Sequence, residues 1–488
     1  MSAELSLPEL LKLHLDKFST NTEPNTNYEL ETRFGTKGQK ITRIQFEKVI
    51  QVLKSKGFSI IDGENGMNIL KIQNEFIDPT LVGSQRVSRI RSEIEGITSI
   101  QHYCKTDSIT KVMDGNDFSV EFVNKTFIKD DKENMVFPIN VDQYNLRISY
   151  QKEISLFKNA GIIKSLIAEW GETKKIFRYM NRTTFTHPRL PFKIDMSIVK
   201  SSTADRRNKP IPVYNIEESG LFKNPETFEI EIELNNELIK QYCLEYPLTA
   251  DSNVEKLKTG LMTLIKHILS GLQDTPYPIS YPEINDLKSK YLELLYGSPQ
   301  KRWLRSSDFC GPSSYTLQMV NIQPLDQDTA APNIRKMYSV TDKADGERKL
   351  LFINEKGLVY LINTNMDFQF SGTKTTNAAI KNTLLDGEHI THNKNGKFIN
   401  LFAAFDIYFI NNESVRNKGF IPTKPKDVAN NFRLPLLQNV VKKQFVSAQN
   451  SGQNPPLTIT SKKFKSGIEE NDIFKGCQEL LNDMEHGM

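Results

Sequence analysis

Two stretches of the chain alternate between charged side chains and largely apolar ones. They are residues 28–34 (YELETRF) and residues 228–234 (FEIEIEL). Because successive side chains of a strand point to opposite faces, each stretch predicts a strand with one charged face and one packing face. Glutamate is a poor strand former, so its repetition at alternate positions calls for a specific chemical reason.

The rest of the hydrophobic pattern separates a strand-rich region from a few helices. Residues 69–235 consist of short alternating runs separated by Gly, Pro, Asn and Asp. This pattern predicts an antiparallel sheet or barrel without a long helix. Apolar residues at helical spacing predict helices at residues 5–18, 42–56, 251–272 and 283–296.

The two acidic stretches could lie in one sheet and bring as many as five carboxylates together. They comprise Glu29, Glu31, Glu229, Glu231 and Glu233. Such a cluster repels itself unless a divalent cation neutralises it, and oxygen-only ligands suit Mg²⁺ or Mn²⁺. Either stretch alone could be an edge strand with its acids in water. The presence of two favours a metal site.

Basic side chains recur on the polar faces of other predicted strands in the same region. The arginines are Arg89 with Arg91, Arg147 beside Ser149, and Arg178 with Arg182, and a further alternating set is Lys193, Asp195 and Ser197. Each set alone would be a solvated strand face. Together with the acidic strands they predict a barrel with a charged interior and an apolar exterior. Such an interior could hold a metal ion and grip the phosphate oxygens of a polyanion.

The length and composition of the chain indicate its division into domains and limit its contacts with nucleic acid. A chain of 488 residues exceeds one ordinary core, and Pro276, Pro278 and Pro282 mark a boundary. We expect a first domain over residues 1–272, a linker with a helix over 273–320, and a second domain over 321–488. The net charge of +4 is small, so contacts with nucleic acid must be local.

The remaining composition bears on the compartment. The four cysteines are scattered, which argues against zinc and a disulfide framework and fits a reducing compartment. No apolar run approaches membrane-spanning length, and the N-terminus does not read as a signal peptide. We therefore expect an intracellular protein without a membrane partner.

The acidic and basic motifs, taken in order, resemble the triphosphate tunnel family of metal-dependent RNA 5′-triphosphatases. The family includes fungal, protozoal and large-DNA-virus capping enzymes, and it implies an eight-stranded antiparallel β tunnel with flanking helices. The resemblance covers about residues 1–240 and implies that Glu29, Glu31 and Glu233 ligate Mg²⁺ or Mn²⁺. Glu229 and Glu231 would then orient metal-bound water, while the basic residues would contact phosphate. Met180 departs from the family pattern, which has a lysine there.

A second motif lies at residues 340–348 (VTDKADGER), with Lys343 close to Asp345, Gly346 and Arg348. A lysine amine is a nucleophile only when neutral, which neighbouring cations or desolvation can achieve. Gly346 would let the backbone approach a ligand closely. The alternative is a charged hairpin turn, for which Asp-Gly is a common sequence.

Residues 384–389 (LLDGEH) and 402–408 (FAAFDIY) follow this motif. Together the three resemble the covalent nucleotidyltransferase superfamily of mRNA guanylyltransferases and polynucleotide ligases. The resemblance implies a mixed sheet and hence an α+β protein. It also implies that Lys343 takes GMP from GTP, with Asp345, Gly346, Arg348, Glu388 and Phe405 around the nucleotide. Glu388 would contact ribose or metal, Arg348 ribose or phosphate, and Phe405 would stack on the base.

The family's later (E/D)GLIF-like strand and Lys-x-Lys motif do not occur in this sequence. We therefore expect the N-terminal part of a larger viral-type capping enzyme, with 5′-triphosphate RNA and GTP as substrates. Further partners would be a C-terminal polypeptide that completes the nucleotidyltransferase, and a cap methyltransferase. A viral protein of this kind would act in the host cytoplasm or the virion. We expect phosphate release from residues 1–488 but little covalent GMP on Lys343.

Three other functions stay open at this point. The second domain could be an ATP-dependent polynucleotide ligase, which adenylate on Lys343 would reveal. The chain could be a non-catalytic subunit that binds RNA ends, or an inorganic polyphosphatase.

Overall fold

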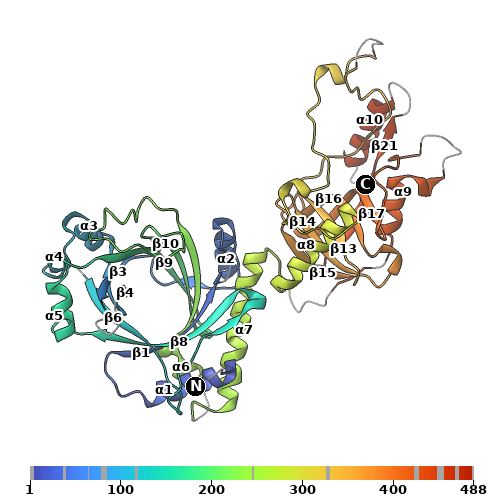
Figure 1. The fold of residues 1–488 in the computed structure, drawn as a ribbon. Coiled ribbons are helices and arrows are strands. Elements are labelled where there is room, and N and C mark those ends of the chain that lie inside the picture. Colours follow the sequence, from blue (N-terminus) through green and yellow to red (C-terminus); the bar gives the residue numbers. More distant parts are fainter. Residues whose placement is uncertain are drawn as a thin grey trace. The chain divides into compact units, whose positions relative to one another are not determined.

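The computed structural model describes residues 5–36, 40–63, 65–77, 85–115, 119–243, 247–325, 330–422, 428–443, 445–447, 456–467 and 472–485. The chain divides into two compact units, Met1–Asp274 and Thr275–Met488 (Figure 1). Within the described ranges, no helix combines the length and apolar composition needed to cross a bilayer.

The first unit is a closed antiparallel β-barrel. Its strands, in barrel order, are β9 (Lys175–His187), β10 (Leu190–Ser201), β11 (Thr227–Leu234), β1 (Thr26–Phe34), β8 (Leu146–Leu156), β6 (Ser119–Phe127), β5 (Ile90–Glu95) and β3 (Met67–Ile77). Pairing of β3 with β9 closes the ring. Short strands β2 (Ser59–Ile60), β4 (Gln85–Val87) and β7 (Ile139–Val141) extend its margins. The predicted antiparallel barrel is confirmed.

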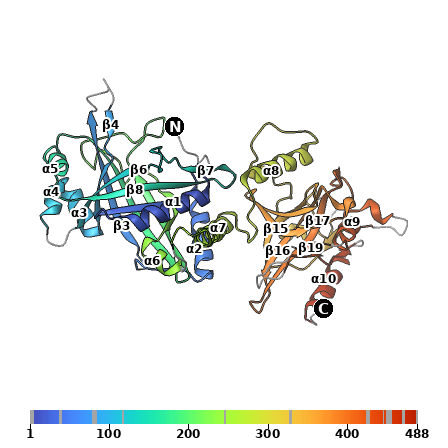
Figure 2. The same cartoon turned by 90° about the horizontal axis from the view of Figure 1, so that it is seen from below.

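Helices cover the outside of this barrel (Figures 1 and 2). They are α1 (Leu7–Thr20), α2 (Arg43–Ser55), α3 (Ile97–Thr106), α4 (Ile109–Met113), α5 (Gly161–Ala168), α6 (Asn236–Tyr242) and α7 (Asp251–Gln273). One apolar cluster joins α1, α2, α6 and α7 to the outer faces of β1, β8, β10 and β11. A second joins α3, α4 and α5 to β3, β5, β6 and β9. The three short helices α3–α5 were not predicted from the sequence.

The second unit is built on a mixed sheet. Its strand order is β18 (Glu413–Ser414), β17 (Phe398–Ile410), β16 (Thr383–His392), β13 (Glu347–Ile353), β14 (Leu358–Asn363), β15 (Phe368–Lys374) and β19 (Val446–Ser447). Strand β20 (Thr458–Ser461) runs parallel to β17, which makes the sheet mixed as predicted. A separate ribbon pairs β12 (Tyr338–Val340) with β21 (Lys465–Gly467) beside α10 (Asp472–Glu485).

Two helices pack on opposite faces of this sheet. Helix α8 (Tyr281–Tyr296) packs through Leu287 and Tyr291 against one face, and α9 (Arg433–Val441) packs against the other. Short 3-10 turns are η1 (Asp142–Tyr144), η2 (Ser306–Asp308), η3 (Met319–Asn321), η4 (Ala378–Ile380) and η5 (Ala429–Asn431). Helix α8, which lies in the predicted linker, is thus part of the second core. The functional domain boundaries predicted from the sequence stay a prediction.

A buried histidine in α1 makes the stability of the first unit depend on pH. His14 is fully buried, and its Nε2 lies 2.9 Å from Asn236 Oδ1. Burial lowers the pKa of His14 from 6.5 to about 4. The unfolded chain therefore binds more protons between these values, so stability falls as the pH drops from about 6.5 to about 4, by about 3 kcal/mol in total.

Replacing His14 with Gln should remove this contribution. We expect the difference in unfolding free energy between the wild type and His14→Gln to shrink by about 3 kcal/mol between pH 7.5 and pH 4. Urea unfolding of the full chain at several pH values measures it. Parallel pH profiles for the two proteins would contradict the assignment.

Candidate active sites

The two acidic strands are direct neighbours in the barrel. β1 and β11 pair antiparallel, with Glu31 opposite Glu233 and Arg33 opposite Glu231. Their apolar residues, such as Leu30 and Ile232, are buried in the outer cluster under the helices. Because side chains alternate along a strand, the glutamates of both strands point into the barrel. The structure thus brings together the carboxylates that the sequence predicts to meet.

Cations on neighbouring strands hold these carboxylates. On β10, Lys193 lies opposite Glu233 in register, and its Nζ is 3.9 Å from a carboxylate oxygen of that residue. On β9, Arg182 donates to Asp195 at 2.8 Å and lies 3.7 Å from Glu231. The Thr184 hydroxyl also donates to Asp195 at 2.9 Å.

Glu229 is held from two sides. Arg33 on β1 lies 2.5 Å from one of its oxygens, and Arg178 on β9 contacts the other. Arg33 also lies 3.5 Å from Glu231. Three predicted basic residues, Arg178, Arg182 and Lys193, therefore line the same interior as the glutamates.

Of the three other predicted arginines, Arg89 and Arg147 lie outside this network. Arg89 is exposed and sits in the bend between β4 and β5 rather than in a strand. Arg147 is exposed on β8, and its Nε donates to Asn140 at 2.9 Å. The neighbour Arg91 instead turns inward, 2.8 Å from Glu153. The alternation of residues predicted that Arg89 and Arg91 share one strand face. It could not show that β5 begins only after Arg89.

A lysine at the centre of the acidic group was not predicted from the sequence. Lys125 on β6 contacts Glu29 and lies 3.6 Å from Glu31 and 3.3 Å from Glu153. A further network of Lys71, Arg91 and Glu93 continues along the same wall. Strand β6 carries only this one inward cation in a run of polar and apolar residues, so no repeated pattern marked it.

Burial in the barrel interior favours the neutral forms of several carboxyl groups. Burial, followed by the neighbouring Glu231 and Glu29, raises the pKa of Glu31 to about 8. Burial, followed by Glu29, raises the pKa of Glu233 to about 7. Burial also raises the pKa of Asp195. Added positive charge nearby would favour the ionised forms of these carboxyls.

Oxygen donors of this kind fit Mg²⁺ or Mn²⁺ by their chemistry. Within the described ranges, however, no group of three or more acidic, histidine or cysteine side chains is already arranged to hold a metal ion. The carboxylates point to Lys125, Arg33, Arg178 and Arg182 instead. The predicted ligands are therefore close together but bound to internal cations.

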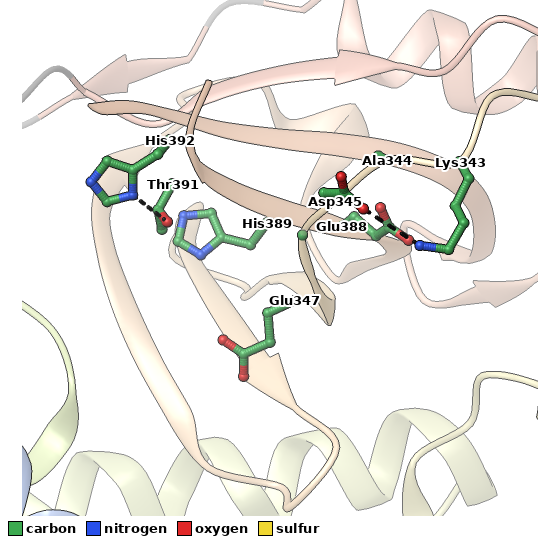
Figure 3. A pocket seen from close by; sticks show the side chains of 9 residues that line it. Lys343, Ala344, Asp345, Glu347, Glu388, His389, Thr391 and His392 are labelled. Carbon is green, nitrogen blue, oxygen red and sulfur yellow. Dashed lines mark hydrogen bonds and ion pairs between the residues drawn. The ribbon is translucent and has the colours of Figure 1, made fainter. Parts of the chain in front are cut away.

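The second candidate site surrounds Lys343, in the segment between β12 and β13. A pocket of about 560 Å³ is lined by Lys343, Ala344, Asp345, Gly346, Glu347, Glu388, His389, Thr391 and His392 (Figure 3). The Lys343 side chain is 88% exposed, and its Nζ lies 3.5 Å from Asp345. A Cβ at Gly346 would lie 3.0 Å from the carbonyl oxygen of His389, so only glycine fits without displacing β16.

Glu388 and Phe405 are placed by the sheet. Glu388 lies opposite Arg348 in register and lines the pocket, and its Oε2 is buried without a hydrogen-bond partner among the described residues. The register shift between Asp386–Asp406 and Gly387–Ala404 leaves Phe405 as the extra residue of a β-bulge. Bulges re-aim side chains, and the Phe405 ring lies 5.8 Å from the Arg348 guanidinium.

Arg348 is held within the protein. It donates to both oxygens of the fully buried Asp386, at 3.2 and 2.6 Å, and to the carbonyl oxygen of Pro312 at 2.6 Å. The Tyr408 hydroxyl donates to Asp386 at 2.6 Å. Asp386 lies inside the LLDGE motif, but its hydrogen-bond partners come from other strands. The sequence therefore did not reveal that Asp386 holds Arg348. The predicted contact of Arg348 with ribose or phosphate stays a prediction.

Comparisons with known proteins agree with this division. Residues 279–487 match the family described as mRNA capping enzyme, catalytic domain. A probable mRNA-capping enzyme of Acanthamoeba polyphaga mimivirus is 26% identical over 308 residues, which are 63% of this chain and 21% of that protein. The chain thus spans about a fifth of the length of this curated relative.

Two solved structures are also similar to this chain. The triphosphatase of the mimivirus capping enzyme covers 55% of this chain and 98% of its own, with 17% identity and a TM-score of 0.32. The S. pombe Pct1 RNA triphosphatase covers 54% of this chain and 93% of its own, with 12% identity and a TM-score of 0.29. The part of this chain that matches the mRNA capping enzyme catalytic domain, residues 279–487, thus follows a closed β-barrel with a charged interior.

Proposed function

We propose that the chain catalyses the first two steps of mRNA cap formation. The barrel removes the γ-phosphate of 5′-triphosphate RNA, and the second unit transfers GMP from GTP to the resulting diphosphate end. The observation that carries the proposal is the joining of a barrel lined by opposed carboxylates and cations to a capping enzyme catalytic domain. The two reactions act in succession on the same RNA end, which explains their presence in one chain.

In the barrel, Glu29, Glu31 and Glu233 would hold Mg²⁺ or Mn²⁺, which would supply charge neutralisation at the phosphate oxygens. Arg178, Arg182 and Lys193 would bind the phosphate chain through charge-assisted hydrogen bonds. Glu229 and Glu231 would orient the attacking water, and Asp195 would hold Arg182 in place. All these side chains line one interior, which keeps bulk water from screening them. Arg89 and Arg147, both exposed, would contact the RNA outside this interior.

In the second unit, the neutral Lys343 amine attacks the α-phosphorus of GTP. A P–N bond forms, the bond to the β-phosphate oxygen breaks, and pyrophosphate leaves. The RNA diphosphate end then displaces the lysine and takes GMP. Glu388 has a free oxygen for the ribose or for a metal, and Phe405 offers a ring for the base. Asp345 and Gly346 shape the segment beside Lys343.

One experiment separates the two activities. The chain is incubated with γ-labelled triphosphate RNA and, separately, with α-labelled GTP, each with Mg²⁺ or Mn²⁺. We expect metal-dependent phosphate release that Lys343→Arg does not change. Peptide mass spectrometry after long incubation should find a small amount of covalent GMP on Lys343. Lys343→Arg should remove it, while Lys356→Arg should not.

Several results would contradict the proposal. AMP rather than GMP on Lys343 would indicate a ligase-like enzyme, and GMP on another lysine would refute the role of Lys343. Binding of triphosphate RNA without phosphate release would indicate a non-catalytic subunit. Release from inorganic triphosphate but not from RNA would indicate a polyphosphatase.

A further inference from the structure

Lys125 lies among three carboxylates that come from two strands, β1 and β8. It lies on β6, and only 18% of its side chain is exposed. Its ammonium contacts Glu29 on β1 and lies 3.6 Å from Glu31 on β1 and 3.3 Å from Glu153 on β8. One compact positive charge is therefore shared by three acids.

Two of these acids, Glu29 and Glu31, are proposed ligands of the divalent metal. An ammonium in contact with them repels a metal ion at the same oxygens and competes for their lone pairs. The third acid, Glu153, lies directly opposite Lys125 on β8, the strand between β6 and β1, and also contacts Arg91 at 2.8 Å. A short movement of the flexible lysine side chain toward Glu153 would free Glu29 and Glu31.

We propose that Lys125 is an internal competitor of the divalent metal, which neutralises Glu29 and Glu31 until the metal binds and then moves to Glu153. The inference rests on the proposed metal site of the barrel. In this scheme, metal affinity depends on the ligands and also on how strongly Glu153 holds Lys125.

The test measures Mn²⁺ binding to the full chain by electron paramagnetic resonance of free Mn²⁺, without RNA or turnover. Lys125→Gln should bind Mn²⁺ about tenfold more tightly than wild type, because a unit charge leaves the immediate surroundings of the metal. Lys129→Gln is the matched control, since Lys129 is exposed beyond the end of β6 and pairs with Glu133. It should leave the affinity unchanged.

Two further variants separate charge from folding. Lys125→Arg keeps the charge and should bind Mn²⁺ with nearly wild-type affinity. Glu153→Gln removes the second resting place of Lys125 and should weaken Mn²⁺ binding severalfold. In the Lys125→Gln background the same substitution should have a much smaller effect, because the two residues act as a pair. Thermal unfolding without metal should show a lower Tm for Lys125→Gln and a larger rise on adding Mn²⁺.

The possible results test the role of Lys125 separately from the proposed metal site. Weaker or unchanged Mn²⁺ binding by folded Lys125→Gln overturns the competitor role. If Glu31→Gln still reduces binding in that case, the proposed metal site stands. If neither wild type nor Lys125→Gln binds Mn²⁺, or if Glu31→Gln changes nothing, the metal site itself fails. Should Lys125→Gln not fold, an undiminished affinity in Glu153→Gln overturns the inference.

Discussion

Replacing Glu31 with Gln should lower metal-dependent phosphate release from triphosphate RNA at least about a hundredfold. Glu31 faces Glu233 across the β1–β11 pair and is one of the three proposed metal ligands. Loss of one group that stabilises developing charge in a water-excluded site commonly lowers turnover by about 10²–10³-fold. The same loss is expected for Glu29→Gln and Glu233→Gln. Release of labelled phosphate at saturating RNA, with Mg²⁺ or Mn²⁺ titrated, measures it.

The protein should stay folded in these variants. Burial, followed by neighbouring carboxylates, raises the pKa of Glu31 to about 8, so the folded state favours a neutral side chain at this position and should accept Gln. We expect the Tm without metal to be unchanged or higher. Glu133→Gln is a matched control on an exposed residue, and its activity should equal that of wild type. A Glu31→Gln enzyme with near-normal turnover would refute the assignment of this ligand.

Replacing Asp386 with Ala should destabilise the second unit by about 3–5 kcal/mol. Asp386 is fully buried and accepts hydrogen bonds from Arg348 and Tyr408, so its loss leaves a half-buried guanidinium and a buried hydroxyl without partners. Denaturant unfolding of the full chain, with hydrogen exchange in β13 and β16 as the local reporter, measures the effect. Asp345→Ala, whose side chain is fully exposed, should change stability by no more than about 0.5 kcal/mol.

A second substitution shows whether the penalty comes from the unpaired charge. Arg348→Met in the Asp386→Leu background replaces both partners with apolar side chains. Such replacement of a buried pair is often neutral, so most of the lost stability should return. If the double variant is as unstable as Asp386→Ala, the loss comes from packing rather than from the stranded arginine.

The alternation of charged and apolar residues predicted much of the fold. It predicted that YELETRF and FEIEIEL are strands with inward acids, and β1 and β11 are indeed adjacent. Alternation is a local property, so it cannot reveal the closure of β3 on β9, which joins residues more than a hundred positions apart. The helices α3–α5 also escaped prediction, since they have only 10, 5 and 8 residues and lie between strands.

In the two candidate sites, the sequence revealed residues that form repeated motifs. It did not reveal single residues that act as their partners. Lys125 is the single lysine of its strand, and its role depends on Glu153 on the adjacent strand β8 and on Glu29 and Glu31 on the next strand, β1. Asp386 was part of a motif, but its structural role depends on Arg348 and on the bulge near Phe405. Partners brought together by register and bulges are set by tertiary structure and leave no local signal in the sequence.

The outward-facing apolar layer of the barrel separates the demands of folding from those of chemistry. Its apolar packing lies between the strands and the covering helices, where, for example, a Cβ at Gly271 of α7 would meet Val49 of α2 at 2.6–2.7 Å. Substitutions in that shell act on stability, whereas those in the lining act on ligand binding. The lining can therefore diversify in evolution, or be redesigned for other phosphorylated ligands, as long as its charges remain balanced, while the outer shell preserves the scaffold.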